Sequence, residues 1–336
     1  MAASEHRRPS MHDVAALAGV SIGTVSYTLN RPERVSEATR ARVLASIEEL
    51  GFVPNSAARS MKAGGTTGLG IVVGDIRHTF SIELARGAQA AATEAGTTLL
   101  IANGNTDMVE QSRYVELFDQ ARMEGIILVP TYDAQRDIDQ LRAHRRRVVI
   151  VNYRSTPADL CSVLMDNVDA GEQATRYLLE RGCRRIGFLT RTAGLQPLDD
   201  RLIGIRRAVD AAGAELTLLE ENHIYEEDGY LAAARLLSED PAIRPDGIVV
   251  GTALMAQGLV LGLRAGGVRV PDDIRVISTE ENVQAADIQL PTMKEPAFEM
   301  GAEAARMTIA ESREGSRHLH RVTILRAELV RADAAG

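Results

Sequence analysis

The chain has 336 residues, of which 45% are hydrophobic and 25% are charged. This length exceeds what one ordinary core organises, so we expect two or three domains, and the composition excludes a largely disordered protein. The net charge of −8 argues against a surface that binds nucleic acid throughout. Residues 1–63 nevertheless carry a net charge of +2, and the remainder carries −10. This asymmetry is what a protein needs if only its head meets DNA, although scattered surface charge is the alternative.

No segment suggests export or membrane insertion. The first residues lack the apolar core of a signal peptide, and no stretch reaches about 18 consecutive apolar residues. The two cysteines, Cys161 and Cys183, are too few for a disulfide framework and match no zinc pattern, so we expect buried or bystander thiols. We therefore expect a cytoplasmic protein with no membrane partner.

Three short helices are predicted at the start of the chain. Ser10 is suited to cap a helix over about residues 11–18, and Gly19 supplies the backbone of a tight turn. Ser21 can cap a second helix over residues 22–29, and a third, amphipathic helix follows. Two helices joined by a three-residue turn, with small residues at their crossing, are typical of a helix-turn-helix DNA-binding unit. An ordinary helical hairpin is the alternative.

Residues 55–62 have the sequence of a short helix of eight residues, between Pro54 and the flexible segment 63–68. Helices shorter than about 12 residues are marginal in water, so we expect this octet to become helical only when a partner orders it. A plain linker is the alternative.

From residue 68 onward, short apolar runs alternate with longer amphipathic stretches. This alternation indicates parallel sheets covered by helices on both faces. About 270 residues are too many for one open sheet, so we expect two similar α/β lobes facing a cleft, with ligands at the carboxyl ends of the strands. Strands are predicted over residues 69–73, 98–102, 126–129, 148–152, 162–165, 186–189, 248–250 and 276–278, and helices near 81–95, 109–123, 167–181, 199–212, 228–238, 253–266 and 296–313.

Several short motifs occur in a specific order and spacing at residues 13–21, 24–26, 29–30, 35–40, 51–55 and 58–61 of the head, and at 125–128, 182–187, 201–204 and 270–273 of the body. In these motifs the chain resembles the LacI/GalR family of bacterial transcriptional regulators over essentially its whole length. The resemblance implies a nucleoid-associated repressor with a headpiece, a hinge helix and a body that is similar to periplasmic binding proteins. It also implies a homodimer on a palindromic double-stranded DNA operator, with a small-molecule effector between the lobes.

By this resemblance, the second helix of each subunit enters a major groove, and paired hinge helices wedge an apolar side chain into the minor groove. Tyr27 stands where the family commonly has arginine, so a guanine contact worth about 1–3 kcal/mol of discrimination is missing and the preferred half-site should differ. Met61 occupies the wedge position. Packing of Ile22 and Tyr27 against the rest of the head is the alternative. The expected DNA-binding residues are Ser21, Ile22, Gly23, Thr24, Ser26, Tyr27, Asn30, Arg34, Thr39, Ala58, Arg59, Met61 and Lys62.

The predicted cleft departs from the family pattern at two places. The pair Thr252-Ala253 stands where the family has asparagine and aspartate, and Glu280 replaces a later aspartate. Because unpaired buried polar groups are costly, a pocket reshaped in this way should reject the usual pyranose. We expect an effector other than a standard hexose, such as an unusual sugar derivative, or none. The expected effector-binding residues are Phe80, Asp166, Arg201, Thr252 and Glu280, with solvated strand-end carboxylates as the alternative for Asp166 and Glu280.

These expectations define three parts of the chain. They are a helix-turn-helix domain over residues 8–53, a hinge helix and linker over 54–67, and an effector-binding and dimerisation domain over 68–336. Within the last part, lobe 1 covers about 68–158 and 288–316, and lobe 2 covers about 159–287 and 317–334. The carboxyl-terminal segment 325–333 reads as a strand without the heptads of a tetramerising tail, which favours a dimer.

Two other functions fit parts of the sequence: an α/β enzyme, or a solute-binding protein, acting on a small polar metabolite. The glycines at 68, 70 and 74 lie at the start of a strand with the wrong spacing for a dinucleotide loop. The histidines show no metal-ligand spacing beyond His318 and His320, and no catalytic set is signalled. A solute-binding protein would leave residues 10–62 unexplained. We therefore expect no catalytic residues, no metal and no cofactor.

Overall fold

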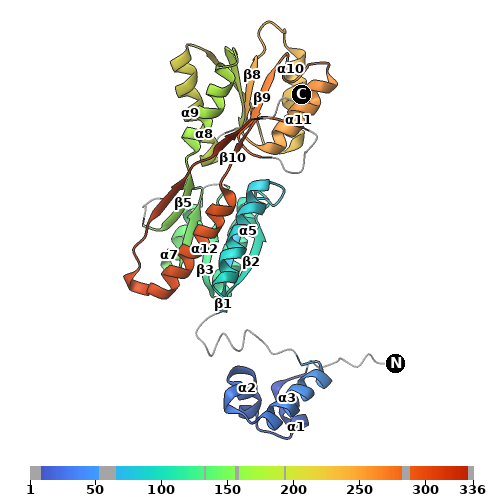
Figure 1. Ribbon diagram of the computed structural model, residues 1–336, viewed down its shortest axis with the longest axis vertical. Helices are drawn as coiled ribbons and strands as arrows, with labels where there is room; N and C mark the ends of the chain where they lie inside the picture. Colours follow the sequence, from blue (N-terminus) through green and yellow to red (C-terminus); the bar gives the residue numbers. More distant parts are fainter. Residues whose placement is uncertain are drawn as a thin grey trace, which may run out of the picture. The chain divides into compact units, whose positions relative to one another are not determined.

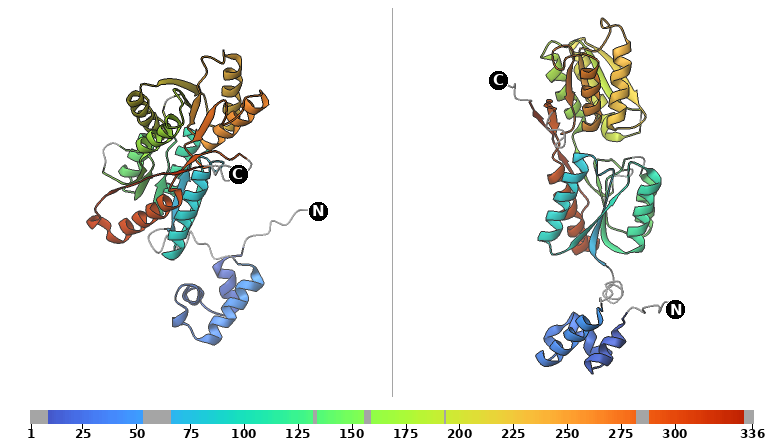
Figure 2. Two further views of the ribbon diagram at one scale, coloured as in Figure 1. Left: turned by 45° about the horizontal axis from the view of Figure 1, so that its top comes forward. Right: turned by 90° about the vertical axis from the view of Figure 1, so that its right-hand side faces the viewer.

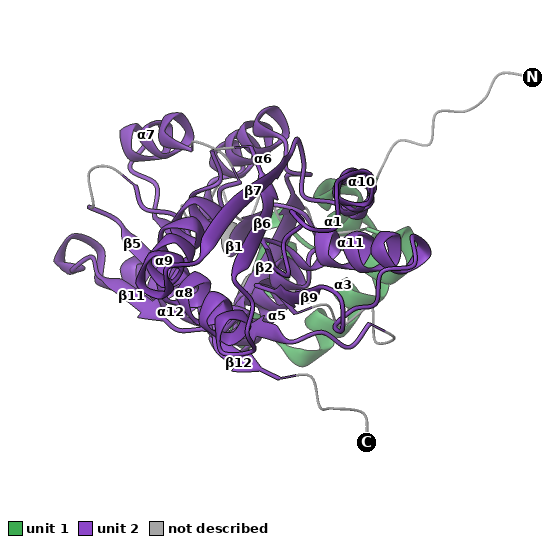
Figure 3. Ribbon diagram, turned by 90° about the horizontal axis from the view of Figure 1, so that it is seen from above, with its two compact units in different colours: residues 1–66 green, residues 67–336 purple. Residues whose placement is uncertain are grey.

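The computed structural model describes residues 9–52, 66–131, 134–155, 159–192, 194–281 and 288–331. The chain divides into two compact units, residues 1–66 and residues 67–336 (Figure 3). Most of the predicted hinge, residues 53–65, lies outside the described residues. Within the described ranges, no helix is both long enough and apolar enough to cross a membrane.

The first unit is a bundle of three short helices whose ends are set by local side chains. Ser10 and Asp13 form reciprocal hydrogen bonds that begin the first helix, and Gly19 ends it at φ +63°, which glycine adopts without strain. Ser21 Oγ accepts a hydrogen bond from the Thr24 backbone N–H at 3.1 Å and begins the second helix. The predicted caps Ser10, Gly19 and Ser21 are therefore confirmed, whereas Ser36 precedes the third helix without a capping hydrogen bond from its side chain. The elements are α1 (Met11–Ala18), α2 (Ile22–Asn30), η1 (Pro32–Arg34) and α3 (Glu37–Leu50) (Figure 1).

One valine from each helix is fully buried at the centre of this unit. Val14 comes from α1, Val25 from α2 and Val43 from α3, and Phe52 joins them after α3 ends. Burying a valine side chain stabilises a fold by about 1.5–3 kcal/mol, so a core of this size supports only a small domain. The α1–turn–α2 arrangement matches the predicted helix-turn-helix.

The second unit contains two six-stranded sheets, one in each lobe (Figure 1). Every strand pair recorded in them is parallel except β10 with β12. Lobe 1 has the strand order β11-β5-β4-β3-β1-β2, and lobe 2 has β12-β10-β9-β8-β6-β7. The lobe 1 strands are β1 (Thr66–Val73), β2 (Thr98–Asn103), β3 (Met123–Leu128), β4 (Val148–Val151), β5 (Cys161–Met165) and β11 (Val322–Leu325), and the lobe 2 strands are β6 (Arg185–Arg191), β7 (Glu215–Glu221), β8 (Gly247–Val250), β9 (Arg275–Ser278), β10 (Thr292–Lys294) and β12 (Glu328–Val330).

Helices cover both faces of each sheet, as Figure 2 shows. In lobe 1, α5 and α12 pack on one face, and α6 and α7 pack on the other; in lobe 2, α8 and α9 form one pair and α10 and α11 the other. The predicted two-lobed α/β body is thus confirmed. The helices are α5 (Thr79–Glu94), α6 (Met108–Gln120), α7 (Gln135–Ala143), α8 (Asn167–Leu179), α9 (Gln196–Ala212), α10 (Glu226–Ser238), α11 (Ala253–Ala265) and α12 (Ala297–Glu314), and the short η2 (Gly315–Arg317) follows.

Three of these helix pairs cross at glycines. A Cβ added to Gly87 of α5 would lie 1.9 Å from the Phe298 carbonyl oxygen of α12, and one added to Gly301 would lie 1.9 Å from the Leu84 carbonyl oxygen. Such distances are far below contact, so the two backbones approach closely because neither crossing residue has a side chain. The same arrangement joins α8 to α9 and α10 to α11.

The chain crosses between the lobes at different places from those predicted. It crosses after Met165, after Lys294 and after Leu325, because β5 and β11 belong to the sheet of lobe 1 and β10 belongs to that of lobe 2. The boundaries predicted near residues 158, 287 and 316 lie before β5, β10 and β11, respectively. They therefore assign each of these strands to the wrong lobe. A strand of three to five residues is defined locally, but the sheet it joins is set by a partner strand that is distant in sequence.

Four elements of the body were not predicted: helix α7 and strands β7, β10 and β11. Strand β11 has only four residues, none of them buried. Helix α7 is rich in charged residues, and its buried apolar side chains are those of Ile138 and Leu141. Strand β7 lies at the edge of its sheet and has mostly exposed side chains, and β10 has only three residues. Each element therefore lacks the sustained apolar pattern on which sequence analysis depends.

Candidate functional site

The exposed face of α2 carries the residues predicted to read DNA. Ile22 and Tyr27 expose 38% and 50% of their surfaces, and Gly23 beside Ile22 is also exposed. These exposures contradict the alternative in which Ile22 and Tyr27 pack against the rest of the head. An isoleucine and a tyrosine presented on one short, capped helix are available to contact base edges and thymine methyl groups in a major groove.

The residues predicted to meet phosphates flank this helix. The hydroxyls of Ser21 and Thr24 lie 2.9 Å apart at its start, and the Thr39 hydroxyl accepts a hydrogen bond from Ser36 at 3.0 Å at the start of α3. Arg34 is exposed at the end of η1, and Ser26 is half-buried. Asn30 is the last residue of α2. Helix starts with hydroxyl caps are suited to phosphate oxygens, because their backbone N–H groups carry partial positive charge.

The remaining predicted DNA contacts, Ala58, Arg59, Met61 and Lys62, lie outside the described residues. They stay predictions.

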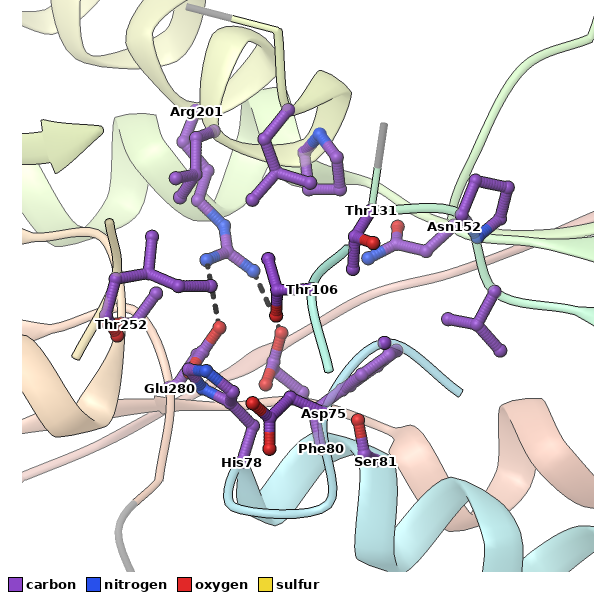
Figure 4. Close-up of a pocket in the computed structure, with 18 residues that line it drawn as sticks. Asp75, His78, Phe80, Ser81, Thr106, Thr131, Asn152, Arg201, Thr252 and Glu280 are labelled. Atoms are coloured by element: carbon purple, nitrogen blue, oxygen red, sulfur yellow. Dashed lines mark hydrogen bonds and ion pairs between the residues drawn. The ribbon is translucent and has the colours of Figure 1, made fainter. Parts of the chain in front are cut away.

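The body contains a pocket between the two lobes, at the carboxyl ends of the strands (Figure 4). The pocket and its mouth together contain about 590 Å³ of empty space. Lobe 1 contributes side chains from the loops after β1, β2, β3 and β4, and lobe 2 contributes them from α9 and from the loops after β8 and β9. The lining residues are Gly74, Asp75, His78, Phe80, Ser81, Thr106, Val129, Pro130, Thr131, Asn152, Leu195, Pro197, Leu198, Arg201, Ile224, Thr252, Glu280 and Glu295.

Arg201 points from α9 into this pocket with only 1% of its surface exposed (Figure 4). Its Nη2 donates to Glu295 Oε1 at 2.8 Å, and its Nη1 lies 3.7 Å from Glu280 Oε1. Its other donors reach the Asn167 side chain, the Gly251 carbonyl and the Thr279 hydroxyl. Most of the guanidinium is therefore occupied by protein groups, and it fixes the geometry of the pocket as well as lining it.

Two buried carboxyl groups share this arginine and titrate differently. Burial and the neighbouring Glu280 raise the pKa of Glu295 to about 8, so Glu295 is protonated at neutral pH. Burial also acts to raise the pKa of Glu280, but the hydrogen bond with His78 and the charge of Arg201 outweigh it, and this pKa lies below its ordinary value. Around Arg201, the pocket thus presents the carboxylate of Glu280, the guanidinium itself and the carboxylic acid of Glu295, which can donate a proton or a hydrogen bond.

The two departures from the family pattern are connected in the structure. Thr252 caps α11 with its side chain, which accepts a hydrogen bond from the Met255 N–H at 3.4 Å and donates one to the Ile224 carbonyl at 3.2 Å. The next residue, Ala253, donates its N–H to Glu280 Oε2 at 3.2 Å. The longer carboxylate at position 280 therefore reaches the positive end of α11, beside the alanine that has no polar side chain to offer. The two residues are therefore in direct contact in this wall of the pocket.

His78 presents a polar atom that is available to a ligand. Its Nδ1 faces Glu280 Oε2 at 3.5 Å, while its Nε2 is buried and has no hydrogen-bond partner among the residues that the structure describes. A buried polar atom without a partner costs free energy, so a ligand that hydrogen bonds to it gains affinity. Next to His78, Asp75 is paired with Arg77 and accepts a hydrogen bond from the Tyr225 hydroxyl at 3.2 Å. Burial acts to raise the pKa of Asp75, but these contacts outweigh it and hold the pKa below its ordinary value.

Of the five predicted effector residues, the structure brings Phe80, Arg201, Thr252 and Glu280 into one pocket. Asp166 is outside the lining: its carboxylate accepts the Asp169 N–H at 3.0 Å and caps α8. Sequence reasoning missed the other polar lining residues. Five of these lie at or just after the ends of predicted strands, so the rule that ligands bind at carboxyl ends could have indicated them. They are Asp75, His78, Thr106, Thr131 and Asn152. Glu295 follows β10, which was not predicted.

Comparison with known proteins agrees with both units. Residues 10–55 match the family described as bacterial regulatory proteins, lacI family, and residues 175–332 match the periplasmic binding protein-like domain. The ribose operon repressor of Escherichia coli strain K12 is 32% identical over 298 residues, which cover 87% of this chain and 89% of that protein.

Solved structures give the same result for the whole length. The transcriptional regulator CelR in its cellobiose complex has a TM-score of 0.71 at 28% identity, covering 97% of this chain and 100% of that one. The lac repressor dimer bound to operator and the anti-inducer ONPF has a TM-score of 0.80 at 20% identity, covering 97% of this chain and 98% of that one, which shows a common fold. These proteins are named as regulators or repressors and not as enzymes. The chain therefore belongs to the LacI family of bacterial transcriptional regulators, with a DNA-binding head and an effector-binding body.

Proposed function

We propose that this regulator represses transcription by binding a palindromic operator as a homodimer, with one α2 in each major groove. The observation that carries this proposal is the exposed face of α2, where Ile22, Gly23 and Tyr27 stand on a helix fixed by the Ser21 cap. A protein that needed these side chains for its own folding would bury them. The dimeric lac repressor on its operator supports the stoichiometry by analogy of fold.

The hinge completes this proposal. Arg59 and Lys62 would meet phosphates and Met61 would enter the minor groove, once the segment 55–62 becomes helical on DNA. Any change in the body that alters how the two hinges of a dimer are held would then alter operator affinity, without touching a DNA contact.

The test is selection of bound fragments from random double-stranded DNA by the purified full chain, combined with its mass in solution. We expect a recovered palindrome and a dimeric mass. A monomer that retains no fragment at low ionic strength would refute the proposal, because phosphate attraction is strongest under that condition.

We further propose that the effector is a small polar, sugar-like molecule other than an unmodified hexose. The pocket offers the free Nε2 of His78, the carboxylate of Glu280 and the acid of Glu295, alongside the apolar Phe80. The cellobiose complex of CelR supports a carbohydrate-related ligand for this fold. An arginine largely bound to protein groups, together with two carboxyl groups, favours a ligand with hydrogen-bond donors or a basic group.

Calorimetry with neutral hexoses, amino sugars and sugar acids tests this pocket directly. We expect one of the derivatives, and none of the plain hexoses, to bind at micromolar affinity and to change operator affinity. Micromolar binding of an ordinary hexose would overturn the effector proposal and leave the DNA proposal standing.

A further inference from the structure

Three side chains that ligate transition metals meet in lobe 1, away from the effector pocket. Cys161 is the first residue of β5, and His318 and His320 lie just before β11, which pairs with β5 in parallel. The cluster is therefore at the amino ends of these strands, whereas the effector pocket is at the carboxyl ends. The spacing of His318 and His320 gave only a partial signal, and the sequence analysis expected no metal, because the cysteine and the nearer histidine are 157 positions apart.

The ligand atoms are close enough to share one ion. One donor atom from each of the three side chains lies within 4.8 Å of the other two, and Cys161 Sγ is 3.1 Å from His318 Nε2. A tetrahedral zinc ion, with bonds of about 2.3 Å to sulfur and about 2.0 Å to nitrogen, holds its ligand atoms roughly 3–4 Å apart. Small side-chain rotations would therefore be sufficient.

The surroundings of His318 are those of a metal-ligating histidine. Its Nδ1 lies 2.8 Å from Glu314 Oε2, and only 5% of its side chain is exposed. This contact leaves Nε2 directed at the thiol. A carboxylate that holds the far nitrogen of an imidazole fixes the tautomer and the orientation that a metal requires.

A second carboxyl group, near the cluster, has one buried oxygen without a hydrogen-bond partner among the described residues. This group is that of Glu311, on α12, which interacts electrostatically with both His318 and His320, and the buried oxygen is its Oε2. A buried carboxylate oxygen without a donor is costly. A divalent cation at the cluster would compensate this carboxylate and a thiolate together.

We propose that Cys161, His318 and His320 bind a Zn²⁺ ion, with Glu311 or a water molecule at the fourth position. A thiolate with two imidazoles is a donor set that selects zinc over magnesium or calcium, which prefer oxygen ligands. The ion fastens the segment before β11 to β5 and α12. It stabilises lobe 1 at the same end of the sheet where β1 begins at Thr66.

Titration of the metal-stripped, tag-free full chain with Co²⁺ tests the site, since thiolate–cobalt coordination gives a charge-transfer band and intense visible bands. We expect about one Co²⁺ per chain, displaced by Zn²⁺, and a rise in melting temperature with either ion. Cys161→Ser should abolish the charge-transfer band. His320→Ala changes an exposed residue that is not part of the core, and it should weaken binding at least about tenfold.

Matched controls separate the site from adventitious binding. Cys183→Ser removes the other buried thiol, and His223→Ala removes an exposed histidine of lobe 2; both should keep the cobalt spectrum. Glu314→Gln should weaken the metal affinity about 10- to 100-fold while leaving the stoichiometry at one. Absence of the charge-transfer band in the wild type, or its survival in Cys161→Ser, would overturn the proposal. The cluster would then be a hydrogen-bonded chain of Cys161, His318 and Glu314 only.

Discussion

The DNA-binding head and the effector pocket place their functional side chains in opposite environments. On α2, Ile22 and Tyr27 are exposed, and the fold of the head depends instead on buried valines. In the pocket, Arg201 is among the largest fully buried side chains, and it connects residues of α8 and of the loops after β8, β9 and β10.

This difference determines how freely residues can be substituted in the two regions. A residue exposed on α2 can be exchanged with little effect on stability, because surface substitutions usually alter it by less than about 0.5 kcal/mol. Under the proposed function, such an exchange changes the preferred operator. A buried residue such as Arg201 cannot be exchanged so freely, because its hydrogen bonds hold several parts of the lobe together.

The largest expected effect is that of Arg201→Ala. Removing the guanidinium breaks a buried ion pair with Glu280, which keeps only His78 and the Ala253 N–H; such a loss typically costs about 3–5 kcal/mol. Urea unfolding of the full chain should show this loss in the transition of the body. Arg206→Ala, an exposed arginine on the same helix, is the control and should change stability by less than about 0.5 kcal/mol. Equal stabilities of the two variants would break the proposed contrast between head and pocket.

The head could be predicted from the sequence because its signals are local. Ser10, Gly19 and Ser21 each act within three or four residues along the chain. The residues of the pocket could not be predicted in this way, because they come together only through contacts between residues that are distant in sequence. Glu295 follows a strand of only three residues, and its partner Arg201 is 94 positions away, so neither its burial nor its raised pKa has a local signature. Asp166 illustrates the opposite error, since a carboxylate at a strand end can simply cap the next helix.

Glu295→Gln tests the protonation of the pocket. The pKa of Glu295 is about 8 in the folded chain and ordinary in the unfolded chain, so the folded chain retains a proton that the unfolded chain releases above about pH 4.5. Stability from this group is therefore fully present below pH 4.5 and is lost up to about pH 8. Relative to the variant, the wild type should lose up to about 1.4 kcal/mol per pH unit in that window. Parallel pH profiles by denaturant unfolding would show that Glu295 is ionised.

Tyr27→Arg tests the exposed face of α2 in the head. An arginine on this exposed face should add a bidentate contact to guanine, changing the recovered half-site and contributing about 1–3 kcal/mol of discrimination. The free energy of unfolding should stay within about 0.5 kcal/mol of the wild type. Selection from random DNA gives the new site. Leu44→Arg adds the same charge to a similarly exposed position on α3, and it should strengthen binding without altering the sequence recovered.

Met61→Ala has the smallest expected effect, and it tests whether the head acts alone. If the hinge inserts this side chain between base pairs, its loss should weaken operator binding about tenfold, or about 1.4 kcal/mol, while the protein stays a folded dimer. The comparison must be made at one salt concentration, because phosphate contacts alone shift the affinity steeply with salt. Met108→Ala, an exposed methionine of the body, is the matched control. If both variants bind like the wild type, operator affinity is carried by the α2 face without the hinge wedge, and effector control must act through the spacing of the two heads instead.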